Sequence, residues 1–152
     1  MNLKQQRTNL KKINANFFRT LGANVRDRYR EHIFGKAKDV HDKPFKQYTS
    51  KQYAERKAAN KFKRQASNYA SSKAPVLTSD LLRDFTLVSA DRGGFRVGWA
   101  SQGAKVKWLA NVGRELTTKR QPFPKKINKY MEREVFKAIE KSLPNKTTRH
   151  KL

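Results

Sequence analysis

The strongest candidates for chemistry in this chain are two histidines and two aspartates within one short stretch. The residues "DVHD" place Asp39, His41 and Asp42 together, and His32 precedes them. Carboxylate and imidazole groups are metal ligands, and a divalent ion held by them could support hydrolysis of DNA. The stretch is also flanked by lysines, and turn formation and solubility favour aspartate at such positions. We therefore interpret it mainly as a solvated loop and keep a metal-dependent nuclease as the third of three hypotheses.

Other catalytic signatures are missing from the sequence. It contains no phosphate-binding P-loop, no G-x-S-x-G elbow and no H-E-x-x-H zinc motif. The glycines of "GGFRVG" lie inside a predicted hairpin, whereas a phosphate-binding loop joins a strand to a helix. We therefore predict that the protein is not an enzyme, with no catalytic residues, no metal site and no cofactor.

The composition points to a partner of opposite charge. The 152 residues include 36 Lys and Arg against 12 Asp and Glu, a formal net charge of +24. Such self-repulsion is relieved beside a polyanion, and nucleic acid is the obvious one. No zinc finger, RNP motif or KH loop is present, so we expect binding without sequence specificity. The candidate contacts to DNA or a partner lie at the two ends of the chain: Lys4, Arg7, Lys11, Lys12, Lys146, Arg149 and Lys151.

Cysteine usage and hydropathy limit the cellular setting. The chain has no Cys, so we expect neither disulfides nor a thiolate metal site, and assembly in a reducing cytoplasm is the simplest interpretation. No run of about 18 apolar residues occurs, which predicts no membrane span. The first residues lack the pattern of a secretory signal.

Two amphipathic helices are predicted, one near each end of the chain. Over residues 13–34 apolar side chains recur every four residues, the spacing of one helix face, with Asn9 as N-cap and Gly35 as the stop. Residues 124–143 show the same spacing and begin at Pro124, whose fixed φ suits a first turn. Both helices have a face wide enough to cover a small sheet.

The middle of the chain predicts a thin helix and a β-hairpin. Thr49 and Gln52 match a capping box that opens a helix over 50–62 with few apolar anchors, so this helix is expected on a surface or against another subunit. Strands are expected over 85–90 and 95–99. One hairpin face is expected to carry Phe85, Leu87 and Ser89. A short apolar piece, "VKWLANVG", and a turn or edge hairpin in "GRELTTKRQPFP" follow.

Together these elements predict an α+β fold. A small antiparallel sheet would pack against the long N-terminal and C-terminal amphipathic helices. We divide the chain into a basic arm over 1–12, a single domain over 13–143 and a basic tail over 144–152. Within the domain, the polar, Ser-rich residues 64–75 predict a flexible connection.

The order of these pieces resembles the tail-completion, or neck (head-tail joining), proteins of tailed bacteriophages, the virion morphogenesis family. It runs from the first helix through "FKQYTSKQYAERK", "VLTSDLLRDF", "FRVGW", "LANVGRE" and "QPFPKKI" to the last helix, over roughly residues 17–143. Ser79 stands where the family usually has Gly, and Ala110 stands near a frequent His. The residues that match the family's motifs are Tyr48, Tyr53, Val76, Leu77, Thr78, Leu81, Leu82, Val97, Gly98, Trp99, Gly113, Pro122, Phe123 and Pro124.

The resemblance implies a structural virion protein that forms a homo-oligomeric ring in the neck. Its implied partners are the head connector or adaptor and the tail proteins, with packaged DNA passing by, and no membrane. Its implied location is the junction of neck and tail, with assembly in the host cytoplasm. A ring requires a heterologous interface that closes on itself.

The alternative function is a ribosomal or other nucleic-acid-binding protein without sequence specificity. Basic tails around a small α+β core fit that class equally well by composition. The order of motifs from the hairpin to "QPFP" is the feature that favours the neck protein.

Overall fold

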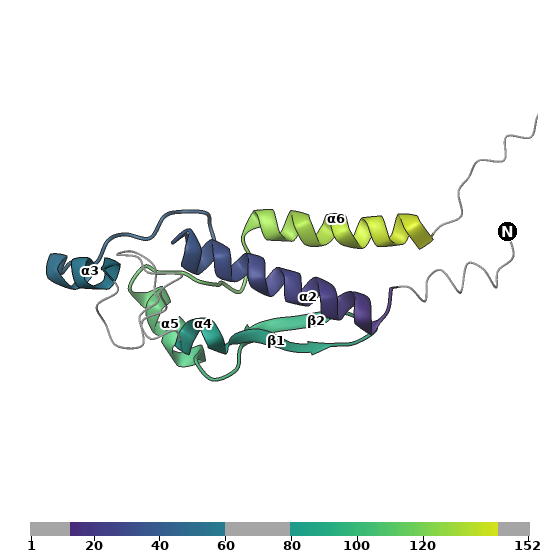
Figure 1. Cartoon of the computed structure of the whole chain (residues 1–152), viewed down its shortest axis with the longest axis horizontal. Helices are drawn as coiled ribbons and strands as arrows, with labels where there is room; N and C mark the ends of the chain where they lie inside the picture. Colours follow the sequence, from purple (N-terminus) through teal and green to yellow (C-terminus); the bar gives the residue numbers. More distant parts are fainter. Residues whose placement is uncertain (1–12, 60–79, 143–152) are drawn as a thin grey trace, which may run out of the picture.

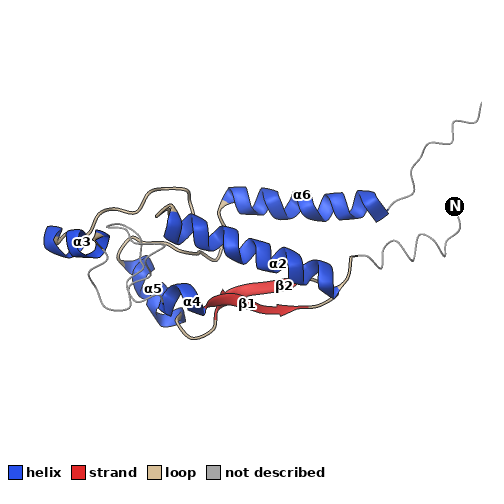
Figure 2. Cartoon of the chain, in the orientation of Figure 1, coloured by secondary structure: helices blue, strands red, loops and turns tan. Residues whose placement is uncertain are grey.

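Helix α2 lies at the centre of the molecule, between a two-stranded sheet and the second long helix, α6 (Figure 1). The computed structural model describes residues 13–59 and 80–142. Figure 2 shows the short helices α3, α4 and α5 gathered toward one end, while the hairpin and the end of α6 extend toward the other. In chain order the elements are α2 (Ala15–Arg30), the π-helical turn η1 (Glu31–Gly35), α3 (Lys51–Ala58), α4 (Asp80–Asp84), β1 (Phe85–Ala90), β2 (Phe95–Trp99), α5 (Gly103–Asn111) and α6 (Lys125–Ser142).

The bounds of α2 are set by residues other than those predicted. The Asn14 side chain accepts hydrogen bonds from the backbone N–H groups of Asn16, at 2.9 Å, and Phe17, at 3.1 Å. Asn9, which lies outside the described residues, is therefore wrong as the N-cap, because a cap must directly precede the first turn. Gly35 is also wrong as the stop. It ends the π-helical turn, and the left-handed conformation falls on Ala37, at a φ of 52°.

Helix α2 packs closely on both strands of the sheet. Its buried face includes Leu21, Val25 and Tyr29. Gly22 lies on the same face, and a Cβ added there would stand only 2.6 Å from Leu87 Cδ1. A two-stranded hairpin is at best marginally stable alone, so this contact with α2 is what holds the sheet.

The two strands form an antiparallel pair with one irregularity. Both strands have the predicted bounds, Phe85 faces Trp99 and Leu87 faces Val97, and the register then shifts between Leu87 and Ser89. Ser89 faces the exposed Arg96, so the prediction that Ser89 shares the inner face is wrong. The reason is a β-bulge, since one extra residue moves all later side chains to the opposite face.

Helix α6 packs against α2 and contributes to the same core. Its Ile127 is buried, and Tyr130, Met131 and Val135 pack on the core cluster. The α+β class is thus confirmed, with a two-stranded antiparallel sheet and long helices near both ends. The predicted arm over 1–12, the connection over 64–75 and the tail over 144–152 lie outside the described residues, as does residue 143 at the end of the predicted domain.

The shorter elements depart from the sequence in detail. Helix α3 is capped by Ser50, whose hydroxyl accepts from Tyr53 N–H at 3.3 Å, so Thr49 is wrong as the capping residue. The apolar piece after the hairpin is helix α5. Between α5 and α6 the chain makes a turn, with Thr118 and Gln121 bonded to each other, and the alternative of an edge hairpin is wrong.

Candidate functional site

An exposed groove lies between α5 and the segment that leads into α3, and three of the predicted motif residues line it. Its volume is about 540 Å³, and apolar surface predominates in its lining. We call it the aromatic groove. Its lining residues are Lys46, Gln47, Tyr48, Thr49, Tyr53, Lys105, Trp108, Leu109, Val112, Gly113 and Arg114.

Helix α5 forms one wall of the aromatic groove because it buries only part of its apolar surface. Val106 and Leu109 lie in the core, whereas Trp108 is 60% exposed and Val112 is 51% exposed. Large apolar side chains left in water are informative when they adjoin a groove, since together they make a surface that a partner can cover.

The Asp84 carboxylate fixes the start of α5. It accepts hydrogen bonds from the backbone N–H groups of Ser101 and Gln102 and from the Ser101 hydroxyl, all within 3.0 Å. Partial burial alone would raise the pKa of Asp84, but these bonds outweigh that effect and lower the pKa below its ordinary value of 3.8. Asp84, the last residue of α4, therefore joins that helix to the start of α5 and holds the wall of the groove in place.

Gly113 turns the chain at the other end of α5. Its φ is 75°, its N–H donates to Ala110 and the following N–H of Arg114 donates to Leu109. This is the Schellman arrangement, in which glycine avoids the cost of a side chain in the left-handed conformation. The turn directs Arg114 back toward the opposite wall of the groove.

Arg114 joins the two walls of the groove. It is buried, donates from Nη2 to the carbonyl of Lys46 at 2.7 Å, and lies 4.1 Å above the ring of Tyr48. Tyr48 meets Tyr53 edge to face, with ring centroids 5.0 Å apart. Burial raises the pKa of the Tyr48 phenol above 10.0, against the opposing effect of Arg114, so the ring stays neutral at physiological pH. The groove thus combines aromatic walls with basic lining residues, the exposed Lys46 and Lys105 and the buried Arg114.

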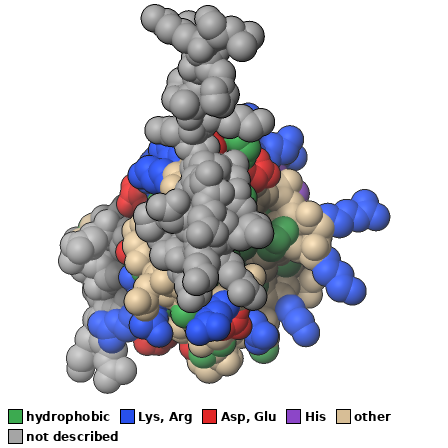
Figure 3. Space-filling view, turned by 90° about the vertical axis from the view of Figure 1, so that its right-hand side faces the viewer, with side chains coloured by type: hydrophobic (Ala, Val, Ile, Leu, Met, Phe, Trp, Pro, Cys, Tyr) green, Lys and Arg blue, Asp and Glu red, His purple; other side chains and the backbone are tan. Residues whose placement is uncertain are grey.

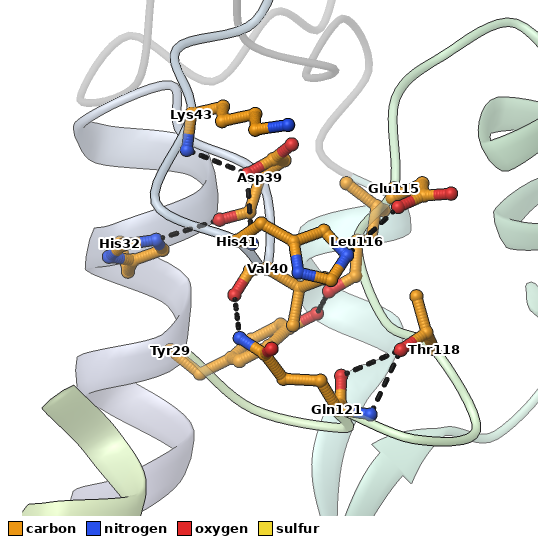
Figure 4. A network of polar contacts seen from close by, with 10 residues as sticks. All are labelled: Tyr29, His32, Asp39, Val40, His41, Lys43, Glu115, Leu116, Thr118 and Gln121. Carbon is orange, nitrogen blue, oxygen red and sulfur yellow. Dashed lines mark hydrogen bonds and ion pairs between the residues drawn. The ribbon is translucent and has the colours of Figure 1, made fainter. Parts of the chain in front are cut away.

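The "DVHD" stretch connects its own loop, after η1, to the loop between α5 and α6 through hydrogen bonds; we call this set of contacts the clamp (Figure 4). The carboxylate of Asp39 accepts from the backbone N–H groups of His41, at 2.9 Å, and Lys43, at 2.8 Å. His41 Nε2 lies 3.0 Å from a carboxylate oxygen of Glu115. His32 Nε2 is bonded to the Asp39 carbonyl at 2.9 Å.

Backbone and amide contacts complete this clamp. Val40 N–H donates to the carbonyl of Glu115 at 3.0 Å, and Gln121 donates to the carbonyl of Val40 at 2.7 Å (Figure 4). Nearby, the hydroxyl of Tyr29 donates to the carbonyl of Leu116. In the part of the chain that the structure describes, no three His, Asp or Glu side chains gather as a metal site. The stretch is a loop, as predicted, but it is only partly solvated, because Val40 is buried and His41 bonds to Glu115.

The predicted motif residues fall into two groups. Leu81 lies in the buried core, and Leu82, Val97, Trp99 and Phe123 pack on it, while Pro124 is buried beside α6. Tyr48, Tyr53 and Gly113 come together instead at the aromatic groove. Gly98 and Pro122 belong to neither group: a Cβ on Gly98 would meet open space, and Pro122 is exposed. The remaining candidates lie outside the described residues: Val76, Leu77, Thr78, Lys4, Arg7, Lys11, Lys12, Lys146, Arg149 and Lys151.

Three residues of this site were not singled out from the sequence. Arg114 contacts Lys46 and Asp84 contacts Ser101 across separations that local patterns do not encode. Trp108 carries one available signal, because a tryptophan that directly follows Lys107 in a short helix is a candidate for an exposed aromatic.

Comparison of the chain with protein-family models, with curated proteins and with solved structures found no match. None of the helices within 13–59 and 80–142 combines the length and the apolar character needed to cross a membrane.

Proposed function

We propose that the protein is a structural component of a tailed bacteriophage virion, forming a ring in the neck that joins the head connector to the tail. It acts at the junction of neck and tail, and assembles in the host cytoplasm. The proposal rests on the order of motifs in the sequence, which runs from the first long helix through the hairpin to the last one.

The observation that carries the proposal is the position of the motif residues. One group packs in the core around the hairpin, and the other, Tyr48, Tyr53 and Gly113, meets at an exposed groove. A groove lined by aromatic side chains and open to solvent suits contact with another protein, because such side chains contribute strongly to association when they are covered. This supports an assembly protein.

The test is the mass of the purified full-length chain by size-exclusion chromatography with light scattering. We expect a defined multimer that survives about 1 M salt, where the Debye length is about 3 Å and bridging by polyanions is screened. Negative-stain electron microscopy of that multimer should show rings. A chain that remains monomeric at 1 M salt and high protein concentration contradicts the proposal.

One observation favours the second candidate, a nucleic-acid-binding protein without sequence specificity. All 12 acidic residues lie within 13–59 and 80–142, whereas the stretches 1–12, 60–79 and 143–152 contain eleven Lys and Arg and no Asp or Glu. Such separation of charge suits contact with phosphates. Duplex DNA added at low salt discriminates the two: a shift in mass that requires DNA, and disappears with salt, supports this second function.

A further inference from the structure

The outward face of α6 carries exposed apolar side chains with charged ones beside them, among which Arg133, three residues before Phe136, pairs with Glu134 at 3.3 Å. Phe136 is 61% exposed and Ile139 is 38% exposed. Glu132 and Glu140 lie four residues before and after Phe136, so they flank it on the same face of the helix. We call Phe136, Ile139, Glu132 and Glu140 the α6 ridge. In the described part of the chain, neither Glu132 nor Glu140 forms an ion pair.

The aromatic groove has the opposite character. Its walls are aromatic, and Lys46, Lys105 and Arg114 supply three positive charges without an acidic lining residue. A phenylalanine flanked by carboxylates therefore matches the groove in both polarity and charge. Acidic side chains are scarce in a chain with 12 of them against 36 Lys and Arg, which makes the position of two beside an exposed Phe informative.

The two surfaces lie at opposite ends of the long axis of the molecule. Helix α5 and the start of α3 are at one end, and α6 runs away from them toward the other end (Figure 1). Figure 3 views that other end, where Lys and Arg side chains surround the surface and fewer acidic groups lie among them. One chain cannot bring its own ridge to its own groove, but two copies can meet there.

We propose that the α6 ridge of one copy docks in the aromatic groove of the next copy. Phe136 inserts between Tyr53 and Trp108, and the flanking glutamates pair with the exposed Lys46 and Lys105. This contact uses different surfaces on the two copies, so it is heterologous, and repeated copies close into a ring or continue as a filament. The inference rests on the proposed function and names the interface through which that assembly forms.

A second copy explains more of the surface than nucleic acid does. Bases could stack on Tyr53 and Trp108 with phosphates beside the lysines. Nucleic acid would leave Phe136 and Ile139 exposed, and its phosphates would be repelled by Glu132 and Glu140. One contact between copies covers both apolar surfaces and sets the two glutamates of the ridge against basic residues of the groove.

The experiment uses two full-length variants, each defective on one surface. The groove variant carries Trp108→Ala and Lys105→Glu, and the ridge variant carries Phe136→Ala and Glu140→Lys. Each variant alone should associate at least about tenfold more weakly than the wild type, since truncating a buried aromatic at an interface costs more than about 1.4 kcal/mol. Mixed together they retain one intact ridge and one intact groove, so they should form a 1:1 dimer and nothing larger.

Matched controls separate the contact from general effects. Val88→Ala removes an apolar side chain that is 49% exposed on the hairpin, and Lys119→Glu reverses an exposed charge outside the groove. Both controls should associate like the wild type. Circular dichroism and thermal unfolding establish that every variant is folded before its mass is compared by light scattering, after nuclease treatment to remove nucleic acid.

The outcomes distinguish this inference from the proposed function. A wild-type multimer that neither variant weakens, or a mixture that yields no 1:1 dimer, overturns the ridge-and-groove contact while leaving the proposed neck function in place. A wild-type chain that stays monomeric overturns both. If the groove variant loses binding to an oligonucleotide while its association is unchanged, the groove is a nucleic-acid site and the contact between copies is wrong.

Discussion

The molecule has two aromatic clusters, one closed and one open. In the closed cluster the rings of Tyr29 and Phe85 are stacked at 4.3 Å, and Trp99 lies 4.7 Å from Phe85. In the open cluster Tyr48 and Tyr53 meet at 5.0 Å beside the exposed Trp108. The first pair is stacked and the second meets edge to face, but the larger difference is in the surroundings.

The difference lies in what covers each cluster. Tyr29 and Phe85 are buried by α2, the sheet and the loops, and burial raises the pKa of the Tyr29 phenol well above its ordinary value. The indole of Trp99 donates to the carbonyl of Leu81 at 3.1 Å. The groove keeps Trp108 in water. The closed cluster is therefore expected to govern folding, while the open one is available for association.

The largest expected effect is a cavity in the closed cluster. Phe85→Ala should lower the free energy of unfolding by about 3–5 kcal/mol, because it removes a fully buried ring that contacts both Tyr29 and Trp99. Urea unfolding followed by tryptophan fluorescence and circular dichroism measures this change. A loss below about 1 kcal/mol would show that the cluster is not the core of the fold.

A smaller effect is expected where α2 approaches the sheet. Gly22→Ala places a Cβ 2.6 Å from Leu87 Cδ1 and 2.9 Å from Phe95 Cδ2. The Leu87 tip can move, but the Phe95 ring has less freedom, so we expect a loss of about 1–3 kcal/mol from overpacking. Thermal unfolding measures it, with Ala23→Gly as a control for helix propensity on the same helix. An increase in stability would indicate that α2 can shift from the hairpin at no cost.

The fold was largely predictable because its long elements have local periods. Apolar residues every four positions predicted α2 and α6 to within a few residues, and alternation predicted both strands. The predictions that failed concern features that depend on one residue, such as the N-cap of a helix or the register of a strand. Asn14 and Ser50 are caps because of the conformation at those positions, and one extra residue in β1 places Ser89 outward.

The candidate site was less predictable because its contacts join distant parts of the chain. The sequence motifs included Tyr48, Tyr53 and Gly113 but gave no reason for them to meet. They meet because Gly113 turns Arg114 toward a carbonyl at Lys46. In the "DVHD" stretch the sequence suggested a site, but the side chains make other contacts. Its residue types suit a metal, but Asp39 bonds to its own loop and His41 to Glu115, a residue in another loop.

The Asp84 carboxylate joins the part of the chain that holds the closed cluster to α5, which carries Trp108 of the open cluster. Its contribution to stability can be tested by measuring thermal unfolding at different pH values. Asp84→Asn removes the charge that holds α5 to the hairpin, and should cost about 1 kcal/mol at pH 7, a value limited by solvent screening at this exposed site. Because folding lowers the pKa of Asp84 below 3.8, its stabilisation is present above about pH 4 and is lost as the pH falls through the lowered value. Thermal midpoints of the variant and wild type should therefore converge in acid.

The control for this pH dependence is Glu55→Gln. Glu55 is exposed and lies 4.0 Å from Lys51, so its loss should change stability little at any pH. A difference between Asp84→Asn and the wild type that is as large at pH 2 as at pH 7 would mean that the variant acts through packing and not through charge.

The smallest effect on stability is expected in the open cluster. Trp108→Ala should change the free energy of unfolding by less than about 0.5 kcal/mol, since the side chain is 60% exposed and its removal leaves no buried cavity. The measurement is urea unfolding at a protein concentration low enough to keep the chain dissociated. The same variant should weaken association at high concentration. Loss of a ring from the closed cluster should thus lower the free energy of unfolding, whereas loss of a ring from the open cluster should lower the affinity between copies. If Trp108→Ala instead destabilises the dissociated chain by more than about 2 kcal/mol, the groove belongs to the core and the distinction between the clusters fails.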